Sequence, residues 1–129
     1  MIGHIGGWIL NVAALTSFAD RTVYAESVLR VARKHALTLL VPDSALYDAY
    51  DVRPDGGPAL ARLLSEPATW LHDRSDVPGA AMSQYCEWTG GDRTAAHVAY
   101  LGRERGWPVL TDKGAALQKV VPDLLIVPA

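Results

Sequence analysis

The sequence predicts an α/β protein: a three-layer α/β/α sandwich with a central parallel sheet of about five strands. Short, wholly apolar runs of strand length recur along the chain, as expected for parallel strands buried on both faces. Segments of helical periodicity separate these runs, which is the order of strands joined by right-handed helical crossovers. The 129 residues suit a single domain, so we expect one domain over 1–129.

The N-terminal part predicts one strand and two helices. The apolar run at residues 8–12 predicts a buried strand, and residues 13–19 follow as a short helix. Residues 22–36 predict the clearest helix, because their apolar side chains recur on one face and their charged side chains on the other.

The next strand and helix meet at Pro42. The run "LTLLV" (37–41) is apolar throughout and predicts a second buried strand. Pro42 ends it, because proline is excluded from strand interiors. Asp43 or Ser44 then caps a helix that runs to about residue 50.

The C-terminal half repeats the alternation. A helix with Asp92 as its N-cap runs to about Arg105, and Gly106 ends it, because glycine readily adopts the left-handed conformation that follows a helix. Around it we expect loops at 52–58 and 74–79, helices at 58–66, 80–89 and 113–119, and strands at 69–72, 107–111 and 123–128.

Polar side chains gather where such a sheet has its functional crevice, at the carboxyl ends of strands near the reversal of strand order. The candidates are the residues that follow or border these strand ends: Asn11, Asp48, Asp92, Thr111, Asp112 and Lys113. Carboxylates that meet at one crevice suit Mg²⁺ or Mn²⁺, which prefer oxygen ligands. Such an ion can activate water and stabilise a phosphoryl transition state.

Each acidic residue also has a purely structural interpretation. Asp92 is a good N-cap, and Asp43 is assigned to capping alone. Asp48 and Asp51, three residues apart, can form a solvated acidic edge of one helix, and Asp112 can be an ordinary turn residue. The grouping at successive strand ends, rather than any one residue, therefore carries the prediction of a site.

Three stretches resemble the PIN-domain family, the fold of the VapC-type ribonuclease toxins of toxin–antitoxin pairs. They are "ILNVAAL", "LLVPDSALYDAY" and "GGDRTAAHVAYLGRERGWPVLTDKGAAL", and the similarity extends over 8–127. The resemblance implies an RNA-cleaving site with a divalent metal. Its implied catalytic and metal-binding residues are Asp48, Asp92 and Asp112, and its implied RNA-binding residues are Asn11, Thr111, Lys113 and Arg93.

The acidic set departs from the family's pattern. Asn11 stands where the family usually has Asp, Ala13 where it has Ser or Thr, and Asp48 is shorter than the Glu often found there. Lys113 takes the last acidic position unless Asp112 shifts into it. At ~5 Å and an effective dielectric of ~20, a unit charge interacts with a divalent ion by roughly 6 kcal/mol. Millimolar affinity amounts to only about −4 kcal/mol, so a Lys113 side chain that points into the crevice predicts a degenerate metal site. If Lys113 points outward and Asp112 turns inward, three carboxylates and the Asn11 carbonyl oxygen form a weak site instead.

We therefore expect a PIN-like protein with weak or no nuclease activity that acts by binding RNA or a protein partner. The alternative is an active Mg²⁺- or Mn²⁺-dependent ribonuclease of the VapC type that uses Asp48, Asp92 and Asp112. An unrelated nucleotide-binding module is disfavoured, because "GHIGG" precedes the first strand and the sequence contains no phosphate-loop pattern.

Composition limits the classes of ligand and the cellular compartment that we expect for the protein. The net charge of −2, from 14 acidic and 12 basic residues, excludes a strong non-specific nucleic-acid binder. Cys86 is the only cysteine, so no internal disulfide can form, which fits a reducing compartment. The sequence has neither a membrane-length apolar run nor a secretory pattern, and we expect a cytoplasmic protein without a membrane partner. The resemblance implies a homodimer and an antitoxin-like partner.

Several conspicuous residues are expected to be structural. We expect His97 to pack at a helix edge and Cys86 to be buried packing. Trp70, Trp88 and Trp107 are interpreted as core or interface residues rather than platforms for stacking bases.

Overall fold

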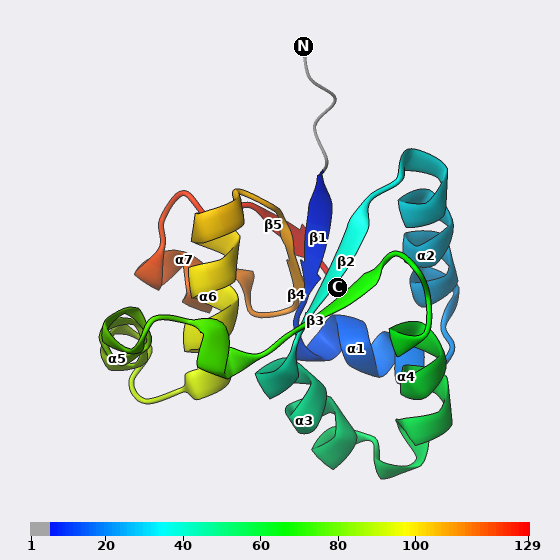
Figure 1. Ribbon diagram of the computed structural model, residues 1–129, viewed down its shortest axis with the longest axis horizontal. Coiled ribbons are helices and arrows are strands. Elements are labelled where there is room, and N and C mark those ends of the chain that lie inside the picture. Colours follow the sequence, from blue (N-terminus) through cyan, green and yellow to red (C-terminus); the bar gives the residue numbers. More distant parts are fainter. Residues whose placement is uncertain (1–5) are drawn as a thin grey trace.

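The computed structural model, which describes residues 6–129, confirms the α/β/α sandwich with one parallel sheet (Figure 1). The sheet has the order β3-β2-β1-β4-β5. Its strands are β1 (Gly7–Leu10), β2 (Thr38–Pro42), β3 (Thr69–His72), β4 (Val109–Thr111) and β5 (Ile126–Pro128). Residues 1–5, which include most of the "GHIGG" stretch, lie outside the described part of the chain.

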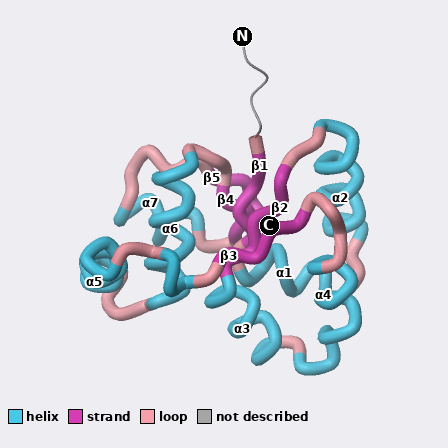
Figure 2. Tube along the Cα trace, viewed as in Figure 1, coloured by secondary structure: helices cyan, strands magenta, loops and turns pink. Residues whose placement is uncertain are grey.

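Helices cover both faces of this sheet, as Figure 2 shows by colour. One layer contains α1 (Val12–Ala19), α2 (Val23–His35), α3 (Asp43–Val52) and α4 (Gly57–Leu64). The other contains α5 (Gly79–Trp88), α6 (Arg93–Arg105) and α7 (Gly114–Val120). Short 3-10 turns lie at Pro54–Gly56 and Arg74–Asp76. Within residues 6–129, no helix has both the length and the apolar character needed to cross a membrane.

Alternation of side chains along the strands divides the interior into two cores. Leu10 and Leu110, which are register partners, face the layer of α1 to α4. Ile9, Leu40 and Val109 form the next row and face α5 to α7. These five side chains are at most 1% exposed. The wholly apolar strands of the sequence are thus explained, because both faces of the central strands are covered.

The helix ends show which capping predictions were right. Asp92 caps α6 by accepting a hydrogen bond from the Ala95 amide at 2.9 Å, and Gly106 ends that helix with φ of +67°. The predicted capping by Asp43 is wrong: Pro42 occupies the N-cap position of α3 and makes no side-chain cap bond. The Asp43 carboxylate instead accepts a hydrogen bond from the Arg74 amide at 3.1 Å, so a tertiary partner has replaced the local one.

Two other predictions need correction. Val12 belongs to α1 rather than to the first strand, because Asn11 is extended and its side chain caps the Val12 amide. Trp70 and Trp88, predicted to be core or interface residues, lie outside the core, with 61% and 49% of their surfaces exposed, and an interface role for them stays a prediction. Trp70 is exposed because β3 is the edge strand of the sheet, paired only with β2.

The winding of the chain defines one special position in the sheet. From β1 the chain proceeds outward to β2 and then β3, and it returns to place β4 on the other side of β1. The order of strands therefore reverses between β1 and β4. In open α/β sheets, ligands bind in the crevice beyond the carboxyl ends of the strands at such a point.

Candidate functional site

A buried hydrogen bond joins the carboxyl ends of β1 and β4 at the point of reversal. Asn11 Nδ2 donates to Thr111 Oγ1 at 3.0 Å, and the two residues are 5% and 1% exposed. Asn11 Oδ1 accepts from the Val12 amide at 2.8 Å, and Thr111 Oγ1 also accepts from the Lys113 amide at 3.0 Å. Both ends of the Asn11 amide group are thus engaged, which fixes its orientation and gives it a structural task.

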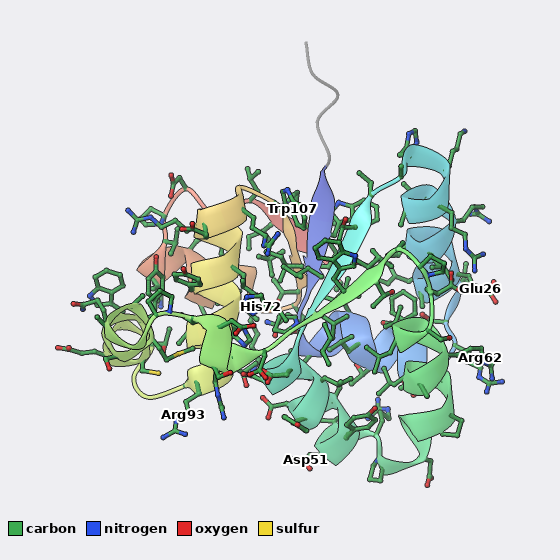
Figure 3. The ribbon with its side chains drawn as sticks, viewed as in Figure 1. Glu26, Asp51, Arg62, His72, Arg93 and Trp107 are labelled. Atoms are coloured by element: carbon green, nitrogen blue, oxygen red, sulfur yellow. The ribbon has the colours of Figure 1, made fainter. Side chains whose placement is uncertain are left out.

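A cavity of about 270 Å³ opens beside this hydrogen bond. It is lined by five of the residues that the sequence singled out, namely Asn11, Asp48, Asp92, Asp112 and Lys113. Thr111 adjoins it through its bond to Asn11. Arg93 lies outside the cavity and projects away from the fold at the start of α6 (Figure 3). The topology therefore brings together residues that are far apart in sequence.

The cavity also has walls that sequence reasoning did not identify. Trp88, Thr94 and Lys119 line it together with the residues above. Thr94 lies two residues after Asp92, and Lys119 lies six after Lys113. Neither is the spacing of three or four residues that brings helical side chains to one face, so no local pattern signalled them. Trp88 comes from α5, whose approach to this edge depends on tertiary packing.

Asp48 is held by a short hydrogen bond. Its Oδ2 accepts from Thr94 Oγ1 at 2.6 Å, the separation of a charge-assisted bond to a carboxylate. Asp48 is half-buried, which corrects the prediction of a solvated acidic edge, whereas Asp51 is exposed as predicted. The carboxylate thus connects α3 to α6 at the wall of the cavity.

The charges around the cavity are mixed. Three acidic residues, Asp48, Asp92 and Asp112, line it together with two basic ones, Lys113 and Lys119, both of which are exposed. Two of the carboxylates already accept hydrogen bonds, Asp48 from Thr94 and Asp92 from the Ala95 amide. Among residues 6–129, no group of three or more His, Cys, Asp or Glu side chains is arranged to hold a metal ion.

The cavity continues into a wider surface depression. Asp48, Asp92 and Thr94 also line a neighbouring hollow of about 410 Å³, which reaches Arg93 and Arg74. Arg74 and Arg93 in turn border a third hollow, of about 730 Å³. Arg74 and Arg93 therefore lie beyond the cavity along this edge, where Asp43 and Asp73 also line the third hollow.

A second polar cluster lies behind the cavity and was missed by sequence reasoning. His97 is fully buried, which corrects its predicted place at a helix edge. Its Nδ1 lies 3.0 Å from Ser44 Oγ, and its Nε2 lies 2.9 Å from His72 Nδ1. Burial, followed by the neighbouring His72, lowers the pKa of His97 to about 4. Burial and then Arg105 also lower the pKa of His72. The sequence does contain one sign of this burial, because His97 stands between Ala96 and Val98, which are also buried, in the apolar part of α6.

Comparison with known proteins assigns neither a family nor a function to the chain. The chain matches neither a model of a known protein family nor a curated protein.

Proposed function

We propose that this chain is a PIN-like domain that binds RNA at the cavity between β1 and β4 and cleaves it weakly or not at all. The observation that carries the proposal is the presence of Lys113 and Lys119 in the cavity that Asp48 and Asp92 also line. An ammonium group binds a phosphate oxygen directly, in the place where a metal-dependent nuclease uses a cation.

Electrostatics supports binding over metal-dependent cleavage. At ~5 Å and an effective dielectric of ~20, one ammonium group opposes a divalent ion by roughly 6 kcal/mol. Millimolar binding of an ion is worth only about −4 kcal/mol, so one lysine directed at the ion would cancel it. Asn11 contributes no negative charge, and its amide is engaged by Thr111 and Val12.

The surroundings of the cavity suit an extended strand of RNA. Arg93 and Arg74 add positive charge beyond the cavity, in a hollow that Asp48 and Asp92 also line. Trp88 forms part of the cavity wall and is 49% exposed, so a base could stack on its ring. Basic side chains beside an exposed aromatic ring are the usual elements of sites for single-stranded nucleic acid.

Fluorescence anisotropy with a labelled single-stranded oligoribonucleotide tests the proposal. We expect Lys113→Gln to weaken binding about fivefold and to reduce the salt dependence, because one phosphate contact is lost. Lys34→Gln is the matched control, since Lys34 is exposed on α2 and lies outside the cavity. Equal weakening by both substitutions, or no binding by the wild type, would contradict RNA binding at this cavity.

The same RNA, incubated with Mg²⁺ or Mn²⁺, separates binding from cleavage. Efficient cleavage that Asp92→Asn abolishes would instead identify the chain as an active ribonuclease using Asp48, Asp92 and Asp112. The homodimer and the antitoxin-like partner stay predictions, and sedimentation velocity on the same sample tests the first.

A further inference from the structure

Two side-chain hydrogen bonds join α3 to α6 beside the cavity. Asp48 binds Thr94 at 2.6 Å, and Ser44 Oγ lies 3.0 Å from His97 Nδ1. Ser44 and Asp48 are four residues apart on α3, and Thr94 and His97 are three apart on α6, so the contacts are neighbours along the helix interface. The contact between Ser44 and His97 is the more buried one, with 4% and 0% of the two residues exposed.

The buried contact is connected to the surface through His72. His72 ends β3 and is half-buried, and Figure 3 shows it close to α6. Its Nδ1 lies 2.9 Å from His97 Nε2, and the centroids of the two rings are 5.1 Å apart. Three hydrogen-bonding groups therefore lead from the edge of the sheet to the start of α3.

The series of hydrogen bonds that joins Ser44, His97 and His72 can run in either direction. In one direction the Ser44 hydroxyl donates to His97 Nδ1, and His97 Nε2 donates to His72 Nδ1. In the other, His72 Nδ1 donates to His97 Nε2, His97 Nδ1 donates to Ser44 Oγ, and the Ser44 hydroxyl turns to Asp43 Oδ1 at 3.4 Å. Both arrangements are neutral at the two rings, because a neutral imidazole has one donor and one acceptor nitrogen.

Protonation of His72 leaves only one of these directions. An imidazolium donates from both nitrogens, so its Nδ1 must donate to His97. His97 is faced by His72, by Asp43 of α3, and by Asp73 and Arg74 after β3. His72 is faced by Arg105 of α6 and also by Asp76, Asp43 and Asp73. Since burial disfavours a charge on His97, the first proton taken up resides on the half-exposed ring of His72.

We propose that His97 is a positioning residue for the cavity. Through its contact with Ser44 it holds α3, which carries Asp48, against α6. Protonation of His72 decides which ring nitrogen of His97 carries the proton. The position of Asp48 affects the cavity in which we propose that RNA binds. This inference depends on the proposed function only in the experiment that measures RNA binding.

Long-range ¹H–¹⁵N NMR of the wild-type chain tests the proton linkage without any ligand. The ¹⁵N shifts distinguish the two tautomers of His97 while the pH is lowered through the titration of His72. We expect His97 to carry its proton on Nδ1 once His72 is charged, and the population of that tautomer to follow the titration of His72. A His97 tautomer that stays unchanged as His72 titrates would overturn the linkage.

A matched pair of substitutions tests the positioning. The amide of His97→Asn can replace Nδ1 and keep the bond to Ser44, whereas that of His97→Gln can replace Nε2 and keep only the bond to His72. The ¹³C resonance of the Asp48 carboxylate reports its bond to Thr94 directly. We expect it to shift in His97→Gln and in Ser44→Ala but not in His97→Asn. An unchanged resonance in all three variants, or an equal shift in all three, would overturn the positioning role.

RNA affinity gives a second readout on the same variants. We expect His97→Gln to bind the labelled oligoribonucleotide about fivefold more weakly, an effect of the size found for residues that support a ligand site without touching the ligand, and His97→Asn to bind as the wild type does. Absence of binding by the wild type would refute the proposed function alone, because the two NMR experiments would still decide the role of His97.

Discussion

Two polar clusters lie at the carboxyl edge of the same sheet, and they are stabilised differently. The cavity cluster, which contains Asp48, Asp92 and Lys113, is charged and accessible. The histidine cluster, which contains Ser44, His97 and half-exposed His72, lies deeper and is linked by neutral hydrogen bonds. The difference follows from hydration: water stabilises the charges of the first cluster, while the second must satisfy its polar atoms internally. The charged cluster is thus suited to binding a ligand, and the neutral cluster is suited to holding the helices around the cavity in place.

Lowering the pH should destabilise the folded chain through the histidine cluster, and this is the largest effect we expect. The pKa of His97 is about 4 in the folded chain against 6.5 ordinarily, so below pH 6.5 the folded state binds fewer protons than the unfolded state. Stability is therefore full above pH 6.5, falls as the pH approaches 4 and levels off below it. At about 1.4 kcal/mol per pKa unit, the loss is on the order of 3 kcal/mol.

Urea unfolding at several pH values checks this prediction. His97→Asn removes the titrating ring and should lose this part of the pH dependence, so the difference between the two proteins isolates His97 from the carboxylates. Parallel stability curves for wild type and variant between pH 7 and 4 would show that the buried ring does not couple to folding.

Placing an acidic residue at the end of the first strand tests the cavity cluster. Asn11→Asp replaces a donor to Thr111 by a carboxylate at a position that is only 5% exposed. We expect a loss of about 2 kcal/mol in unfolding free energy, because a charge is buried and a hydrogen bond is changed.

Thermal unfolding with and without millimolar Mg²⁺ measures this loss and its reversal. Mg²⁺ should raise the Tm of Asn11→Asp, since a ligand that binds only the folded state stabilises it, and should leave the wild type unchanged. Asn11→Ser is the control, because serine can still cap α1 without adding charge. A wild type stabilised by Mg²⁺ as strongly as the variant would mean that the cavity already holds the ion.

The aromatic wall of the cavity provides a smaller test. Trp88→Ala should weaken the binding of single-stranded RNA about tenfold, because stacking of a base is worth roughly 1–3 kcal/mol. Trp70→Ala is a matched control, since Trp70 is 61% exposed on β3 and does not line the cavity. Anisotropy titrations of the two variants decide the point, and equal affinities would exclude stacking on Trp88.

Thr69 gives the smallest expected effect and completes the comparison. Its Oγ1 is buried and has no hydrogen-bond partner among the described residues, unlike the polar atoms of the histidine cluster. Thr69→Val replaces the hydroxyl by a methyl group of similar shape, and we expect a gain of up to about 1 kcal/mol in unfolding free energy. Urea denaturation measures it, and a clear loss of stability would show that the hydroxyl has a partner, such as bound water.

The sequence predicted those features that depend on local pattern. Apolar runs identified the strands, and the rule that parallel strands end at one edge brought Asn11, Asp48 and Asp92 into one group. Capping chemistry was right for Asp92 and wrong for Asp43, because the Arg74 amide, thirty-one positions further along the chain, competes for the Asp43 carboxylate. Local rules hold only where no tertiary partner intervenes.

The histidine cluster could not be predicted, because its members come from three elements. Ser44 is the second residue of α3, His72 ends β3 and His97 lies within α6. Their contacts depend on the rotation of each helix and on the register of β3 against β2, which no short stretch of sequence encodes. The same is true of Trp88, whose position depends on how α5 packs against α6.

The exposed edge strand has a practical consequence for anyone handling this protein. Trp70 and Leu71 are 61% and 56% exposed on β3, which pairs on one side only. Natural sheets usually protect such edges with charged residues, since an uncovered strand invites pairing with another molecule. Concentrated samples should therefore self-associate through this strand. Leu71 does not line the cavity, so Leu71→Lys should keep the samples dispersed, as sedimentation velocity at increasing concentration would measure.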